Sequence, residues 1–364
     1  MTPDTRLTLL LSGIASFILM GAGQAVFGPA LPIFQRSFGL DTATVGWLIS
    51  AFWIGSFLGV VAMYFIGSRV PPTVGLAAIL VGAVLLATPP GWAAALIGAG
   101  LFGSGYGCIA ALFNPRILNA FGPRGPAMLS LLNATFAIGA IATPLIFVSL
   151  GSDPKLIFWT IAALTALTLI ASARIGSTGV TPAVDTTPFR LHSPILCFGM
   201  VAIGIEVSLV GLGPTAMIRA GLPADRAAEL LSLFFVAYLA GRLGLVPLAN
   251  RTPPFAIYSA ACAIAALCAL GCALFNPAWF FPPLGLAAGL FFPGYYVTAT
   301  AKMGVDARVG PLILGVGLIG AILSPLVYIR LMEIGGARGF FWLIAGVAGA
   351  LTLLVLVSRR RMAR

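Results

Sequence analysis

A succession of long apolar runs, separated by short polar breaks, constrains the fold of this chain more than any other feature. A helix that crosses a bilayer needs about 20 predominantly apolar residues, and about twelve runs approach that length. The runs are continuous rather than alternating, which argues against membrane-spanning β-strands. The predicted spans are 7–31, 45–67, 72–89, 91–113, 126–149, 154–174, 193–217, 226–248, 253–274, 277–300, 308–330 and 338–358.

The balance of apolar and charged residues excludes a soluble protein. The chain is 60% hydrophobic and 8% charged, with a mean hydropathy of +1.08, whereas a soluble domain carries about 25% charged residues. The net charge of +11 is spread singly between apolar runs, apart from a cluster of arginines in the final six residues. This pattern fits topology signals and contacts with anionic lipid headgroups rather than a nucleic-acid partner. We therefore predict an all-α membrane protein of about twelve transmembrane helices.

The distribution of basic residues predicts the orientation. With the N-terminus in the cytoplasm, most of the 20 Lys and Arg residues fall in cytoplasmic loops and tails, as the positive-inside rule requires. Both termini are therefore expected to be cytoplasmic, in a plasma membrane or bacterial inner membrane. The first run lies close behind Arg6 and is long enough to span, so it is expected to be a retained helix rather than a cleaved signal.

The longest polar stretch lies almost at the middle of the chain. Residues 176–192 are rich in Thr, Ser and Pro, which is typical of a linker. We predict an N-terminal six-helix bundle over 1–175, a cytoplasmic linker over 176–192 and a C-terminal six-helix bundle over 193–364.

The two predicted halves resemble each other. At a shift of 182 residues, Ser, Phe, Gly and Pro positions around the second span of each half coincide without a gap, and Gln24 falls on Glu206. A shift of 181 superimposes a second set in the fifth span of each half. The matched pairs are Ser50/Ser232, Phe52/Phe234, Gly59/Gly241, Pro71/Pro253, Pro72/Pro254, Pro32/Pro214, Gly139/Gly320, Thr143/Ser324 and Pro144/Pro325. Such matches predict two parallel repeats of six helices.

With this repeat, the chain resembles the major facilitator superfamily over nearly its whole length. Within it, three stretches are most similar to the fucose permease-like sugar symporters. They are the Gly-rich fourth span with the fifth (Asn114, Asn133, Phe136, Gly139, Pro144), the Gly-x-Glu of the seventh (Gly204, Glu206), and Gly241-Arg242 of the eighth. The resemblance implies a monomeric transporter that works by alternating access, with its solute site near the membrane midplane. The loop after the second span, which contains Arg69, departs from the superfamily pattern because it has no acidic residue.

Glu206 is the most informative single residue. It is the only one of the nine acidic residues near the middle of a predicted span. A carboxylate there is costly unless it faces a cavity or a partner, so it is a candidate for solute binding or proton coupling. The alternative is a protonated glutamate that hydrogen-bonds a neighbouring helix. Its repeat mate Gln24 can donate to and accept from a solute hydroxyl, or can join two helices instead.

The other candidates are polar and aromatic residues of the spans. Asn133 and Asn114 are candidates for solute hydrogen bonds, although Asn114 precedes Pro115 and could simply end the fourth helix. Arg242 could latch an inner gate together with Arg69 and Gly241, attract an anionic solute, or extend to the headgroups. Phe136, Tyr238 and Tyr295 are candidates for stacking on a sugar ring, while most aromatics in spans face lipid or the core.

These residues predict a transporter rather than an enzyme. The spans contain no cluster of His, Cys or acids suited to metal, acid–base or nucleophilic chemistry, so neither a cofactor nor a metal is expected. The favoured interpretation is a secondary transporter of a small polar solute, a sugar or sugar-like compound, coupled to protons through Glu206. One alternative is a proton-driven exporter of drugs or metabolites. The other is a lipid-handling or receptor-like membrane protein that transports no solute.

Overall fold

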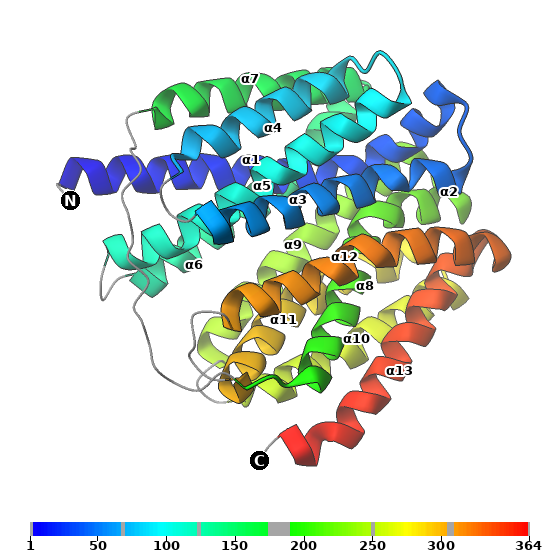
Figure 1. The fold of residues 1–364 in the computed structure, drawn as a ribbon. Coiled ribbons are helices and arrows are strands. Elements are labelled where there is room, and N and C mark those ends of the chain that lie inside the picture. Colours follow the sequence, from blue (N-terminus) through cyan, green and yellow to red (C-terminus); the bar gives the residue numbers. More distant parts are fainter. Residues whose placement is uncertain are drawn as a thin grey trace. The chain divides into compact units, whose positions relative to one another are not determined.

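The computed structural model describes residues 3–66, 70–121, 125–173, 190–248, 252–303 and 309–362. Within these ranges the regular structure is entirely helical, and it comprises twelve long helices with two short ones (Figure 1). Eleven of the long helices are long and apolar enough to cross a membrane. The predicted all-α fold with about twelve transmembrane helices is therefore confirmed.

The chain forms two compact units, Met1–Pro182 and Ala183–Arg364. The helices of the first unit are α1 (Pro3–Phe38), α2 (Thr42–Val45), α3 (Trp47–Ile66), α4 (Pro72–Ala87), α5 (Trp92–Ala120), α6 (Gly125–Ser149) and α7 (Pro154–Ser172). Most of the predicted linker, 176–189, lies outside the described residues. The limits predicted for the two bundles and the linker therefore stay a prediction.

Over its described residues, the second unit repeats this series of helices without a counterpart of α2. It consists of α8 (Ser193–Arg219), α9 (Ala224–Leu248), α10 (Pro254–Leu274), α11 (Pro277–Met303), α12 (Val309–Ile334), the short 3-10 helix η3 (Gly336–Arg338) and α13 (Gly339–Met362).

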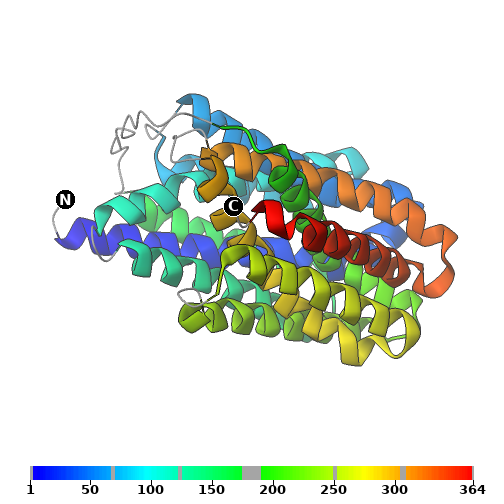
Figure 2. The same ribbon diagram turned by 90° about the horizontal axis from the view of Figure 1, so that it is seen from below.

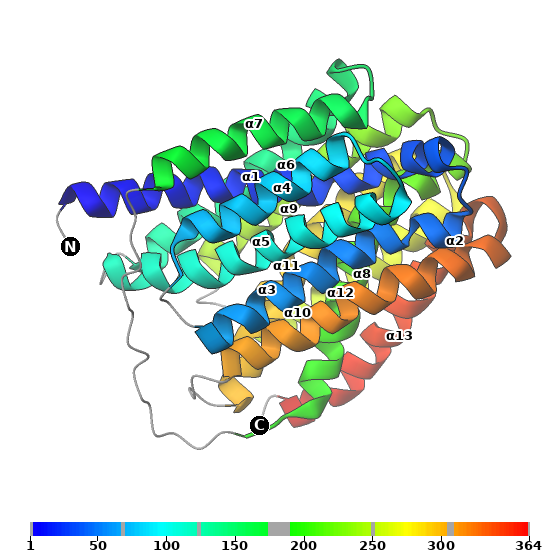
Figure 3. The same cartoon turned by 45° about the horizontal axis from the view of Figure 1, so that its top comes forward.

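The helices of each unit pack in the same order. In the first unit α1 packs on α6 and α3 on α5, and Figure 3 shows α4 between α5 and α7. In the second unit α8 packs on α12, α9 on α11, and α10 on both α11 and α13; Figure 2 shows α10 beside α13. Each contact in one unit therefore has its counterpart in the other, as a six-helix repeat requires.

Glycines make the closest of these helix contacts. A Cβ placed on Gly103 of α5 would overlap the carbonyl group of Phe52 on α3, and a Cβ on Gly285 of α11 would overlap that of Phe234 on α9. The four residues form two pairs at the shift of 182 seen in the sequence. Small residues of this kind allow helix backbones to approach closely in membranes, so the repeat preserves the contacts as well as the sequence.

Proline sets the N-terminal end of several helices. Pro72, Pro154 and Pro254 are the first residues of α4, α7 and α10, and Pro194 is the second residue of α8. At these positions a missing N–H costs no helical hydrogen bond. The helix α4 has 16 residues and is about 24 Å long, which is shorter than the 72–89 span that the sequence predicts. It ends at Ala87 because Pro89 and Pro90 follow, and Pro disfavours a helical conformation in the residue before it.

Two helices, α1 and α5, continue through a proline at which the sequence suggested that they could end. The first span was predicted over 7–31, but α1 continues through Pro32 to Phe38. The suggestion that Asn114 ends the fourth helix is wrong, because α5 continues to Ala120. A proline in a membrane helix is tolerated where neighbouring helices and side chains satisfy the carbonyl that it leaves unpaired, and both helices are packed on several others.

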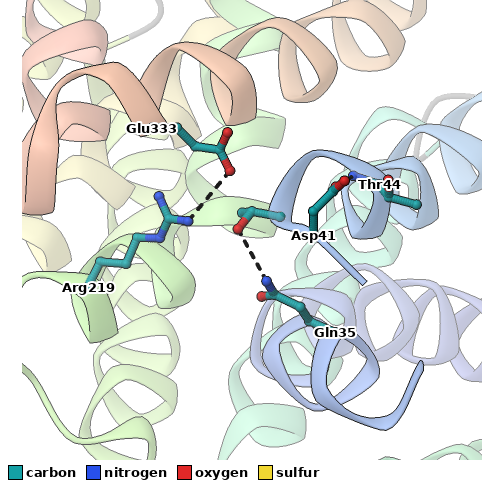
Figure 4. Close-up of polar contacts among 6 residues, drawn as sticks. Gln35, Asp41, Thr44, Arg219 and Glu333 are labelled. Atoms are coloured by element: carbon teal, nitrogen blue, oxygen red, sulfur yellow. Dashed lines mark hydrogen bonds and ion pairs between the residues drawn. The ribbon is translucent and has the colours of Figure 1, made fainter. Parts of the chain in front are cut away.

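Polar contacts hold the C-terminal ends of α1 and α8 (Figure 4). In the first unit the Gln35 Nε2 atom donates to the Thr42 Oγ1 atom at 3.2 Å, and the Asp41 carboxylate caps α2. In the second unit Arg219 lies 3.9 Å from Glu333 of α12. Both side chains of this ion pair are partly exposed, so its contribution to stability is expected to be at most about 1 kcal/mol.

Candidate functional site

Glu206 lies on α8, in the second unit. It is the middle residue of the 27-residue helix α8, and residues 204–217 are all buried, so this part of the helix is enclosed on every face. The Glu206 side chain is only 8% exposed. A carboxyl group enclosed in this way needs polar partners from neighbouring helices, because an unpaired polar group in an apolar surrounding is costly.

Two residues of α9 provide a chain of hydrogen bonds to this carboxyl group. The Tyr238 hydroxyl donates to the Glu206 Oε1 atom at 3.2 Å. The Arg242 Nη2 atom in turn donates to the Tyr238 hydroxyl oxygen, and the guanidinium carbon lies 4.5 Å from the centre of the Tyr238 ring. The acid and the base are thus connected through one hydroxyl group, with Tyr238 and Arg242 one helical turn apart.

The residues at the two ends of this series of hydrogen bonds, Glu206 and Arg242, each have a polar atom without a partner among the described residues. Among the residues that the structure describes, neither the buried Glu206 Oε2 atom nor the buried Arg242 Nε atom has a hydrogen-bond partner. The second oxygen of a carboxyl group can accept a hydrogen bond, or donate one when protonated, whereas the Nε–H of arginine only donates. The network therefore contains one group of variable charge, the Glu206 carboxyl, and one permanent cation, the Arg242 guanidinium.

The first unit places a neutral pair at the corresponding position. Gln24 of α1 is 8% exposed, and its Oε1 atom accepts a hydrogen bond from the Tyr106 hydroxyl of α5 at 3.2 Å. The Tyr106 ring lies 5.8 Å from that of Trp53 and 5.3 Å from that of Phe52, measured between ring centroids. A side-chain amide beside aromatic rings is suited to the hydroxyls and apolar face of a sugar-like molecule.

Tyr106 was not among the residues that the sequence singled out. It lies in the Gly-rich stretch of α5, between Gly105 and Gly107. The signal in the sequence was a single tyrosine set among the glycines of this helix. Its partnership with Gln24 depends on the packing of α5 against α1 and could not be obtained from spacing along the chain.

The remaining polar candidates of the first unit lie on two helices. Asn133 is half-buried on α6, and Asn114 is half-buried on α5 with a buried Oδ1 atom that has no hydrogen-bond partner in the described part of the chain. Phe136 is 8% exposed, and its backbone carbonyl meets α1 at Gly21. None of these contacts assigns a role to Asn133, Asn114 or Phe136, and their predicted contacts with solute stay predictions.

Tyr295 occupies a packed position in the second unit. Its side chain is fully buried, and its ring fills the space beside Gly199 of α8. Its hydroxyl donates to the backbone carbonyl of Ile313 on α12 at 3.1 Å. Tyr295 therefore joins α11 to two neighbouring helices, and this bonding explains its burial without a solute.

Replacing Tyr295 with Phe is expected to lower the stability of the protein by about 1 kcal/mol, because the Ile313 carbonyl loses its side-chain donor. Thermal unfolding of the purified protein in detergent measures this change. Unaltered stability together with weaker uptake would instead favour the solute contact that the sequence predicts for Tyr295.

The predicted gate residues divide into three cases. Arg69 lies outside the described residues. Gly241 lies on α9, where a Cβ atom would come within 2.9 Å of the Leu286 carbonyl oxygen of α11, so it permits a close helix contact. Arg242 donates a hydrogen bond to Tyr238, and its predicted part in a gate stays a prediction. A buried arginine that the sequence did not single out, Arg116, donates to the Val70 carbonyl at 2.9 Å and so holds the segment after α3.

Comparisons with known proteins identify the family. The family model of the Major Facilitator Superfamily matches residues 13–312 of the chain. The chain belongs to the major facilitator superfamily. No curated protein matches it by sequence. As a superfamily member it is a multi-pass membrane protein and a secondary transporter of a small molecule, not an enzyme.

Solved structures of several transporters share the fold. A mutant form of the nucleoside transporter NupG is 14% identical with a TM-score of 0.78, over 97% of this chain and 99% of that one. A POT family transporter in complex with a thioalcohol-conjugated peptide is 13% identical with a TM-score of 0.80, over 99% and 97%. A D-xylose–proton symporter is 12% identical with a TM-score of 0.76, over 96% and 97%. At these identities the likeness concerns the fold alone, and the fucose permease-like assignment stays a prediction.

Proposed function

We propose that this transporter moves a small polar solute, a sugar or sugar-like compound, and couples its movement to protons through Glu206. The observation that carries the proposal is the buried carboxyl group at the middle of α8, with one oxygen bonded to Tyr238 and the other unpartnered among the described residues. An ionisable group inside a membrane helix bundle is typical of solute pathways and proton relays.

The polar residues of the two units have separate roles in this proposal. In the second unit Glu206 takes up and releases the proton, Tyr238 orients its carboxyl group, and Arg242 fixes Tyr238 in turn. In the first unit Gln24 and Tyr106 bind solute hydroxyls, and the neighbouring Trp53 ring stacks on an apolar face. Asn133, Asn114 and Phe136 are further candidates for solute contact. The transport cycle is alternating access between two repeats, as in secondary transporters with this architecture.

The proposed setting follows from the distribution of charge. The protein lies in a plasma membrane, or a bacterial inner membrane, as the monomer that the resemblance to the superfamily implies. Both of its termini lie in the cytoplasm, because the basic residues concentrate in the loops that this orientation places inside.

A panel of solutes tests the proposal on the full-length protein. Purified protein is heated with sugars, polyols, nucleosides and organic anions, because a ligand that binds the folded state raises the unfolding temperature by mass action. A stabilising solute is then supplied to proteoliposomes with an imposed proton gradient. Uptake that follows the gradient inward supports the proposal, and outward pumping supports the exporter alternative. Absence of saturable flux, with stabilisation by lipid alone, would support the lipid-handling alternative.

A further inference from the structure

The half-buried arginine of α9, Arg242, places a permanent positive charge where a neutral solute would not need one. Arg242 extends one turn along its helix toward Tyr238, and its Nε atom is buried without a partner in the described part of the chain. Removing a guanidinium from water is costly unless charges or hydrogen bonds compensate for it. Neutral side chains such as that of Gln24 bind hydroxyls without this cost, so the position of Arg242 requires another explanation.

Arg242 and ionised Glu206 carry opposite charges, and both are hydrogen-bonded to the Tyr238 hydroxyl. When Glu206 is ionised, the network contains one positive and one negative group joined by a single hydroxyl. An added anion leaves one uncompensated negative charge unless Glu206 takes up a proton. The binding of an anion and the protonation of Glu206 therefore favour each other, since the site then remains neutral overall.

The Glu206 Oε2 and Arg242 Nε atoms, which have no partner among the described residues, are suited to binding an anion together with a proton. A guanidinium is a planar fork of donors that suits carboxylate oxygens, and its Nε–H is part of that fork. The Glu206 Oε2 atom becomes a donor when it is protonated, while Oε1 can still accept from Tyr238. A hydroxyl of the solute can then accept from Glu206, and its carboxylate can accept from Arg242.

We propose that the solute is a small hydroxylated monocarboxylate, such as a sugar acid, whose carboxylate binds Arg242 as Glu206 becomes protonated. This inference rests on the proposed transport of a sugar-like solute and narrows its class. Each cycle carries one carboxylate and one proton across the membrane, so the step is electroneutral. A phosphate ester is disfavoured because its charge near neutral pH, about −1.5 to −2, exceeds what one proton and Arg242 balance.

Matched pairs of solutes test the charge requirement. Galacturonate is compared with galactose, and gluconate with sorbitol, by thermal shift and by isothermal titration on the purified wild type. Glucose 6-phosphate is included for the phosphate class. We expect one or both acids to bind, and each neutral partner and the phosphate ester to bind at least about tenfold more weakly, because a charge-assisted bidentate contact is lost or its charge is unbalanced.

Three variants and one control show which residue accounts for the preference for the acid. Arg242→Gln is expected to weaken binding of the acid by about tenfold or more and to leave the neutral sugar unaffected, while Arg242→Lys, which keeps the charge without the fork, recovers part of the affinity. Glu206→Gln resembles the protonated acid and is expected to retain or strengthen binding of the acid. Arg330→Gln removes an exposed arginine of α12 from the same unit and serves as the control for lost charge.

The outcomes separate this inference from the proposed function. Binding of neutral sugars at least as strong as that of the acids overturns the inference and leaves a sugar transporter. Tighter binding of the phosphate ester, or equal losses in Arg242→Gln and Arg330→Gln, also overturns it. If no sugar or acid binds or is transported, both fail. The unfolding temperature of each variant without solute shows whether it is folded, and Arg242→Lys provides the test if Arg242→Gln is not.

Discussion

Replacing Glu206 with Gln is expected to abolish proton-driven accumulation of solute and to lower the steady-state level in vesicles to that of passive equilibration. Gln keeps the shape of the side chain and accepts the hydrogen bond from Tyr238, but it cannot gain or lose a proton. Exchange of labelled for unlabelled solute needs no net proton movement, so it should continue. The measurement is uptake of the stabilising solute into proteoliposomes with and without an inward proton gradient, beside an exchange assay on the same preparation.

A matched carboxylate provides the control for this experiment. Glu333 belongs to the same unit, at the end of α12, but it is exposed and paired with Arg219 at 3.9 Å. Its replacement by Gln should leave gradient-driven accumulation unchanged, because an exposed ion pair contributes little. If Glu206→Gln accumulates solute as the wild type does, Glu206 is not the coupling residue, and its hydrogen bond to Tyr238 is structural.

The fold was largely predictable because a membrane leaves a helix few alternatives. Continuous apolar runs must satisfy their backbone polar groups internally, so run length and spacing predicted twelve long helices. The errors concern local effects. The apolar run of α4 is cut short by flanking prolines, whereas α1 passes through Pro32 because its neighbours stabilise it. The short helix α2 depends on its N-cap residue Asp41, and a hydropathy profile does not show the effect of a single capping side chain.

The candidate site was only partly predictable. Glu206 and Arg242 could be singled out from the sequence because a carboxyl or guanidinium group inside an apolar run is conspicuous. Their partnerships were not, because Glu206 lies on α8 while Tyr238 and Arg242 lie on α9, and a sequence does not state which faces of two helices meet. The Gln24–Tyr106 pair shows the same limit. The repeat did not help, since it places Ser56, not a tyrosine, at the position of Tyr238.

Substitution of Gly103 or Gly285 with Ala is expected to destabilise the protein strongly and to similar extents. Each added methyl carbon would lie 2.7 Å from a backbone carbonyl carbon, that of Phe52 in the first case and of Phe234 in the second. Overpacking costs about 1–3 kcal/mol even where side chains can move. Here the obstacle is backbone of another helix, so we expect the upper end of that range or more. Thermal unfolding in detergent measures the loss for each variant.

Gly346→Ala on α13 is the control that separates packing from helix propensity. A Cβ atom at Gly346 meets no other atom within 4 Å, so this change adds only the preference of helices for Ala over Gly and should leave stability equal or higher. The clashing variants are therefore expected to lose stability and the control is not, although the chemical change is identical. If Gly103→Ala lost much stability and Gly285→Ala lost none, the two units would not rely on equivalent helix contacts. That result would contradict a structural repeat.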